Sequence, residues 1–144
     1  MLYMLDTDSV SYLIRGTCPA LDARVARARP DDLCISAVTR GELLFGLELT
    51  PGAHRLAQLV DRFLQHVRSL PWDDGCAGRF AIVAAALHRS GTPIGSMDAM
   101  IARHAIALDA VLVTNNTRHF SRIPDLLIEN WATGAPARHH AAAR

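Results

Sequence analysis

Three carboxylic acids and one amide have the types and positions that could hold a divalent metal ion. They are Asp6, Glu42, Asp98 and Asn116. Mg²⁺ and Mn²⁺ prefer hard oxygen ligands of this kind. Acids brought close together raise one another's pKa and destabilise the fold, and a bound cation relieves this repulsion. If the fold gathers these side chains, the chemistry they support is metal-assisted activation of water for phosphodiester hydrolysis.

The sequence predicts that the ends of strands position three of these four residues. Asp6, Glu42 and Asn116 each come shortly after an apolar run that is typical of a strand buried in a parallel sheet. These runs are residues 2–5, 33–35 and 110–113. Parallel strands end at one edge of their sheet, where ligands of open α/β sheets bind. We therefore expect the three side chains to meet there.

Asp98 lies in a predicted helix that precedes the strand at 110–113. Ser96 is the expected N-cap, and the helix runs to about Leu108, because good helix formers and apolar residues recur at three- and four-residue spacing. An acid in the first turn of a helix is commonly there because the helix dipole favours it. Asp98 becomes a candidate ligand only because Asp6 and Glu42 are expected at the same edge.

The remaining sequence alternates predicted strands with single helices or helix pairs. This pattern favours an α/β fold with a central parallel sheet of about five strands and helices on both faces. In the helix that runs to about Leu49, we expect Phe45 to face the core with Leu43 and Leu47. His104 is expected to be half-buried. The other predicted helices are 10–15, 20–28, 54–67 and 76–89, and the other predicted strands are 69–72 and 126–128.

Length and composition indicate one domain. The chain has 144 residues, and we assign 1–131 to the domain and 132–144, which lacks a core pattern, to a flexible tail. The net charge is +1 and all 15 basic residues are Arg, so an anionic substrate needs a local patch or a metal ion. Three widely spaced Cys and no apolar run near 18 residues predict a cytoplasmic protein with reduced thiols and no membrane contact.

Four motifs together resemble those of the PIN-domain ribonuclease toxins of bacterial toxin–antitoxin modules, the VapC-like family. They are MLDTDS, ISAVTRGELLFGLE, PIGSMDAMIARHA and LVTNNTRHF, in the order and spacing of that family. The resemblance implies a PIN fold and an endoribonuclease that uses Mg²⁺, or Mn²⁺ in its place. The expected substrate is RNA, either tRNA or rRNA, whose cleavage inhibits translation and growth.

The same resemblance implies particular partners. The family forms homodimers, and a small VapB-like antitoxin encoded alongside neutralises the toxin. Operator DNA would be contacted only through the antitoxin complex, because this chain shows no basic recognition element. The apolar helices from Leu43 to Val67 are the expected docking surface for the antitoxin.

The family's acidic positions fall on Asp6, Glu42 and Asp98, which are the expected metal ligands. Asn116 stands where the family often has Asp, so the sequence leaves open whether one or two ions bind. Thr114 and Arg118 are the expected residues for positioning water or the scissile phosphate. His119 stands where relatives often carry an acid, and no role is assigned to it. These assignments are implied by the resemblance.

Two other functions remain open from the sequence. The stretch LDTDSV at residues 5–10 also fits the nucleophile motif of haloacid-dehalogenase-type phosphatases. Those enzymes need a basic residue, usually Lys, beside the phosphoryl group, and this chain has no Lys. A PIN-like binding module without catalysis is the second alternative, because the fourth acid is missing. The presence of Asp6, Glu42 and Asp98 argues against it.

Overall fold

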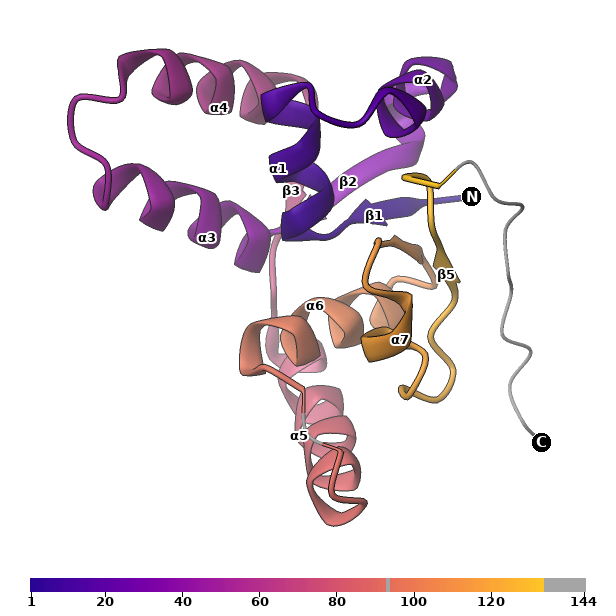
Figure 1. Ribbon diagram of the computed structural model, residues 1–144. Helices are drawn as coiled ribbons and strands as arrows, with labels where there is room; N and C mark the ends of the chain where they lie inside the picture. Colours follow the sequence, from indigo (N-terminus) through magenta and orange to yellow (C-terminus); the bar gives the residue numbers. More distant parts are fainter. Residues whose placement is uncertain (93, 134–144) are drawn as a thin grey trace.

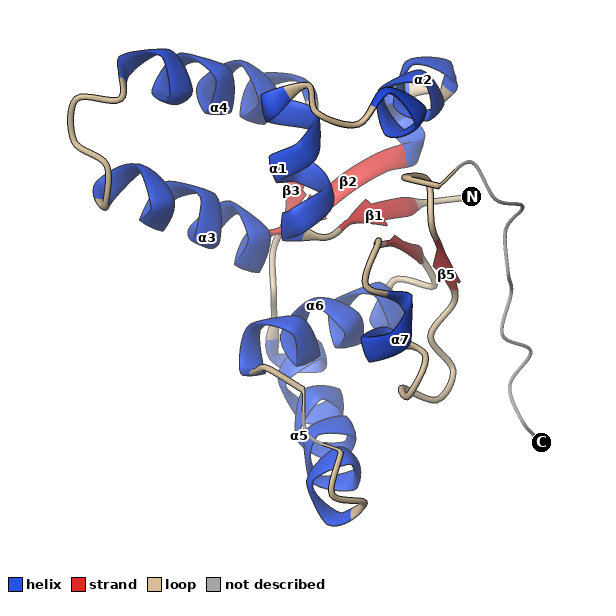
Figure 2. Cartoon of the chain, viewed as in Figure 1, coloured by secondary structure: helices blue, strands red, loops and turns tan. Residues whose placement is uncertain are grey.

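The computed structural model describes residues 1–92 and 94–133, which contain a five-stranded parallel sheet (Figures 1 and 2). Its strand order is β3-β2-β1-β4-β5, and all four neighbouring pairs are parallel. The strands are β1 Tyr3–Leu5, β2 Leu33–Ser36, β3 Arg68–Leu70, β4 Val111–Val113 and β5 Ile128–Glu129. Because β1 pairs with both β2 and β4, the ends of the three central strands lie side by side. The predicted parallel sheet of five strands is confirmed.

Helices cover both faces of this sheet. The helices α1, α2, α3 and α4 lie on one side, and α5, α6 and α7 lie on the other (Figure 1). Their bounds are α1 Thr7–Arg15, α2 Pro19–Arg27, α3 Ala37–Glu48, α4 His54–His66, α5 Asp74–Arg89, α6 Ser96–Ala107 and α7 Thr117–Phe120. A short 3₁₀ turn, η1, spans Pro30–Asp32. None of the described helices is long and apolar enough to cross a membrane.

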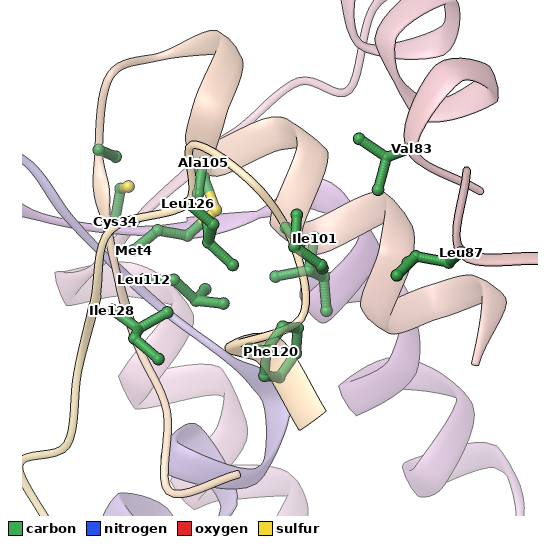
Figure 3. Close-up of a cluster of buried hydrophobic side chains, with 13 residues drawn as sticks. Met4, Cys34, Val83, Leu87, Ile101, Ala105, Leu112, Phe120, Leu126 and Ile128 are labelled. Carbon is green, nitrogen blue, oxygen red and sulfur yellow. The ribbon is translucent and has the colours of Figure 1, made fainter. Parts of the chain in front are cut away.

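The core divides into two layers because successive side chains of a strand point to opposite faces. The three central strands contribute Met4, Cys34 and Leu112 to the layer under α5 and α6, and Leu5, Ile35 and Val113 to the layer under α1–α4. All six are almost completely buried. In the first layer, Phe120 at the end of α7 packs with Ile101 of α6 (Figure 3). This packing fixes α6 and α7 beside the edge where the candidate ligands lie.

The structure corrects two expectations about the helices. The N-cap of α6 is Gly95, with no side-chain cap hydrogen bond, so Ser96 is the first helical residue and the prediction that it caps was wrong. Phe45 does not face the core, because its side chain is 63% exposed. The reason is that α3 and α4 extend beyond the sheet as a pair (Figure 1). The helix α7 was not predicted. Of the expected tail, 132–144, the part from 134 onward lies outside the described residues.

Candidate active site at the carboxyl edge of the sheet

Asp6 is the most rigidly held of the candidate ligands. It follows β1 directly, caps α1, and is only 3% exposed. One carboxylate oxygen, Oδ1, accepts a hydrogen bond from the backbone N–H of Ser9 at 2.9 Å. The other oxygen, Oδ2, accepts one from the Thr114 hydroxyl at 2.6 Å. Burial raises the pKa of Asp6, and the hydrogen bonds from Ser9 and Thr114 oppose that rise.

Thr114 connects the end of β4 to Asp6. Its side chain is buried, and its Oγ1 also accepts a hydrogen bond from the backbone N–H of Asn116 at 3.0 Å. The Thr114 hydroxyl therefore orients the Asp6 carboxylate and tethers the turn that carries Asn116. The expectation that Thr114 positions water or a phosphate stays a prediction.

Glu42 lies in the second turn of α3, and a threonine at the start of α1 holds its side chain in place. Thr7, the first residue of α1, donates from Oγ1 to Glu42 Oε1 at 2.8 Å. The hydroxyl of the buried Thr39 lies 3.1 Å from the same Thr7 oxygen, within hydrogen-bond distance. The two threonines therefore fix the half-buried Glu42 carboxylate from α1 and from its own helix. The sequence considered Thr39 only as a helix cap and gave Thr7 no role.

Asp98 lies in the first turn of α6, and the pKa of its carboxyl group responds to the other acids of the site. Partial burial raises its pKa most, and the negative charges of Asp6, Glu42 and Asp8 raise it further. His119 opposes this rise, because its Nε2 lies 3.7 Å from Asp98 Oδ2. The structure therefore brings the three predicted acids into one electrostatically coupled region. Within residues 1–92 and 94–133, however, no three His, Cys, Asp or Glu side chains are arranged to hold one ion among them as they stand.

Asn116 and Arg118 lie at the solvent-exposed rim of this region. Asn116 is the N-cap residue of α7, but its side chain makes no capping hydrogen bond. Its exposed side chain and that of Arg118 therefore face solvent rather than the core. The adjacent Asn115 accepts a hydrogen bond from Asn130 at 3.1 Å, which ties the turn after β4 to the segment after β5.

Comparison with known proteins places this geometry in a family. The sequence model of the PIN-domain family matches residues 3–126 of this chain. The tRNA(fMet)-specific endonuclease VapC of Salmonella typhimurium is 36% identical over 129 residues, which cover 90% of this chain and 97% of that protein. Ribonuclease VapC2 of Rickettsia felis is 33% identical over 132 residues, covering 91% of this chain and 98% of that protein. This chain belongs to the VapC family of PIN-domain ribonucleases.

Solved structures of VapC family members agree with this assignment. The structure of DNA-bound VapBC from Salmonella typhimurium aligns with a TM-score of 0.84 at 36% identity, covering 91% of this chain and 99% of that chain. VapBC2 of Rickettsia felis, bound to a DNA fragment from its promoter, also gives a TM-score of 0.84, at 31% identity, over 91% of this chain and 99% of that chain. The expected PIN fold is confirmed, and family membership decides against the phosphatase alternative.

A buried histidine joins the two helices that carry Glu42 and Asp98 in this VapC chain. His104 of α6 lies with its Nδ1 2.8 Å from the hydroxyl of Ser36. Ser36 also caps α3 by accepting a hydrogen bond from the backbone N–H of Val38 at 3.1 Å. His104 is almost fully buried, and not half-buried as the sequence predicted. Its hydrogen bond therefore fixes the relative position of the two helices behind the candidate ligands.

Acidification is expected to destabilise the protein partly through His104. Burial lowers the pKa of His104, and the charge of Asp73 opposes this without outweighing it. The unfolded chain therefore binds more protons than the folded chain below the ordinary imidazole pKa of about 6.5, and stability falls as pH drops below it. His104→Gln should flatten the change in melting temperature between about pH 7.5 and pH 5.5. His88→Gln, at an exposed histidine, is the control. An unchanged pH profile in His104→Gln would contradict this role.

Proposed function

We propose that this chain is the toxin of a type II toxin–antitoxin module and a metal-dependent endoribonuclease. It hydrolyses phosphodiester bonds in RNA, inhibits translation and growth, and is neutralised by a cognate antitoxin. One observation carries the proposal: Asp6, Glu42 and Asp98 come from three separate elements to one sheet edge, where burial and the charges of Asp6 and Glu42 raise the pKa of Asp98. Membership of the VapC ribonuclease family supports it.

The residues at this edge fit a hard divalent cation. Their donors are carboxylate oxygens. The pKa of Asp98 is raised first by burial and then by the negative charges of Asp6 and Glu42, and a bound cation would offset both effects. Asp6 and Asp98 would hold Mg²⁺, or Mn²⁺ in its place. When bound, the ion would lower the pKa of a water molecule and stabilise the developing charge on the phosphate oxygens. Asn116 brings no charge, which favours one resting ion over two.

The side chains of this chain would perform the remaining tasks. The two hydrogen bonds from Ser9 and Thr114 fix the Asp6 carboxylate before any substrate binds. Glu42, held by Thr7, would serve as a further ligand or orient the attacking water. Arg118 and Asn116 at the exposed rim would contact the RNA phosphate, Arg118 through the planar guanidinium that suits phosphate oxygens.

The substrate that we propose first is tRNA, with rRNA as the second class. The VapC proteins of Salmonella typhimurium and Shigella flexneri, 36% and 34% identical to this chain, are both named tRNA(fMet)-specific endonucleases. Because the proposed substrate is RNA, the proposed site of action is the cytoplasm.

Cleavage of total cellular RNA by the purified, antitoxin-free chain tests this function. Parallel reactions contain Mg²⁺, Mn²⁺ or EDTA, and one EDTA reaction then receives excess Mg²⁺. We expect discrete fragments that disappear with EDTA and return with added metal, and sequencing of their ends identifies the RNA that is cut. If well-folded protein yields no fragments with either metal, the chain is a binding module and the missing acid at Asn116 is the first explanation to examine.

The antitoxin is expected to bind the paired helices α3 and α4. Leu44 and Phe45 of α3 and Leu49, its C-cap residue, are exposed, although each is large and apolar. Glu42 is on the same helix, so an antitoxin bound there would reach the candidate active site. Structures of VapBC relatives are complexes bound to DNA. We propose that this chain forms a homodimer, binds its antitoxin, and reaches operator DNA only through it.

A further inference from the structure

His119 places an imidazole nitrogen against Asp98 in the candidate active site. Its Nε2 lies 3.7 Å from Asp98 Oδ2, and the two side chains are 27% and 39% exposed. The imidazole ring packs edge-on against the neighbouring Phe120, with ring centroids 5.8 Å apart and planes at 87°. Phe120 is buried in the core, so α7 is anchored with His119 on the side of Asp98.

The separation of these two atoms is informative. At 3.7 Å, it exceeds the length of about 2.7–2.9 Å that a charge-assisted hydrogen bond adopts. Two ligand atoms that contact one ion at about 2.0–2.2 Å each can be up to about 4.2 Å apart. The Nε2 and Oδ2 atoms are therefore too far apart for a direct hydrogen bond and close enough to contact the same cation.

We propose that His119 and Asp98 ligate the same metal ion, and that His119 makes the site prefer Mn²⁺ and Co²⁺ to Mg²⁺. Mn²⁺ also favours oxygen ligands, but Mn²⁺ and Co²⁺ accept an imidazole nitrogen beside them more readily than Mg²⁺, which is bound mainly by oxygen atoms and water. The described residues contain no preformed group of three His, Cys, Asp or Glu ligands. Two ligands, one on α6 and one on α7, are sufficient here because water molecules complete the coordination of such ions. This inference rests on the proposed function, whose metal it specifies.

A different role for His119 makes the opposite prediction. If the imidazole only neutralises Asp98 as an ion-pair partner, it competes with the metal for that carboxylate. Removing it would then strengthen the binding of every divalent cation. If it is a ligand, its removal weakens the binding of transition metals and changes Mg²⁺ affinity little.

Metal binding to the full chain, measured by titration calorimetry at one fixed pH, separates these roles. We expect His119→Gln to weaken Mn²⁺ binding by about tenfold or more and Mg²⁺ binding by less than about threefold. His119→Glu, which supplies an oxygen ligand, should bind Mg²⁺ at least as tightly as the parent but lose the preference for Mn²⁺. His88→Gln is the control at an exposed histidine of α5. The visible absorption of bound Co²⁺ should change in His119→Gln, since a nitrogen ligand is lost.

Several results would overturn the proposal. Equal or tighter Mn²⁺ binding by His119→Gln would show that His119 is not a ligand. If Asp98→Asn nevertheless abolishes metal binding, the proposed nuclease site stands without His119 as a ligand. If the unaltered chain binds neither metal, or if Asp98→Asn binds both normally, the metal-dependent function itself fails along with the role of His119. Melting temperatures of all variants establish that each is folded.

Discussion

Replacement of Asp98 by Asn is expected to lower RNA cleavage by about 10³-fold or more, and to raise the melting temperature of the metal-free protein. The loss of activity follows because an amide brings no charge to bind or neutralise the cation that would activate water. Several kcal/mol of transition-state stabilisation depend on such an ion, which corresponds to a rate change of this size. Cleavage of a purified tRNA mixture under single-turnover conditions measures it.

The gain in stability follows from the electrostatics of the same residue. The pKa of Asp98 is raised, first by burial and then by Asp6 and Glu42, so the folded protein disfavours its charged form. Above this raised pKa, the native carboxylate carries a free-energy cost that the unfolded chain does not. Asp98→Asn removes that cost. Because the Asp98 side chain is 39% exposed, solvent screening limits the gain to below about 1 kcal/mol, or a few degrees.

Asp74 provides the matched control for this prediction. Like Asp98, it is an acid in the first turn of a helix, but it is exposed and belongs to α5. Asp74→Asn loses only the favourable interaction with the helix dipole, so its melting temperature should fall slightly and its cleavage rate should stay within about twofold of the parent. Equal effects of the two substitutions would contradict a metal-binding role for Asp98 and leave it as helix-terminal charge.

The sequence predicted the sheet and the gathering of acids because both depend on local patterns. Short apolar runs that end in Asp6 and in the turn with Asn116 indicate buried parallel strands, and parallel strands end at one edge by geometry. The order of the strands was not needed for this inference. It was enough that β1, β2 and β4 belong to one sheet, which the structure confirms.

The parts that the sequence could not predict depend on contacts between distant segments. Nothing near His119 in the sequence indicates that its ring faces Asp98, because the pairing is produced by the packing of α7 through Phe120. The hydrogen bond from Thr7 to Glu42 also joins residues 35 positions apart. A periodic pattern places Thr7 at a helix start but does not say which carboxylate its hydroxyl meets.

Phe45 was predicted wrongly for a different reason. An apolar residue at helical spacing is expected to face the core of its own chain. The pair α3 and α4 extends past the sheet, so part of the apolar surface of α3 has no described residues over it, and Phe45 is 63% exposed. If the proposed antitoxin binds α3 and α4, the same apolar pattern marks a surface that a second chain would bury.

Phe45→Arg is therefore expected to weaken binding of the cognate antitoxin by about 100-fold or more, without reducing RNA cleavage by the free toxin. Large exposed apolar residues that lie close together mark sites of protein interaction. Phe45 has Leu44 before it on α3 and Leu49, the C-cap residue of α3, four positions after it. Loss of a central aromatic anchor costs about 2–4 kcal/mol of binding energy, which is a 30- to 1,000-fold change in affinity. Titration calorimetry with the purified antitoxin measures it.

Ile82→Arg separates this surface from a general effect of an exposed apolar residue. Ile82 is 71% exposed on α5, on the opposite side of the sheet, so its substitution makes the same chemical change far from α3. We expect antitoxin binding by Ile82→Arg to stay within about threefold of the parent, because it removes no anchor from the α3–α4 surface. The reverse order of effects would place the antitoxin on the α5 side. In cells, Phe45→Arg should remain toxic when the antitoxin is co-expressed, since the candidate metal ligands are intact while its neutralisation fails.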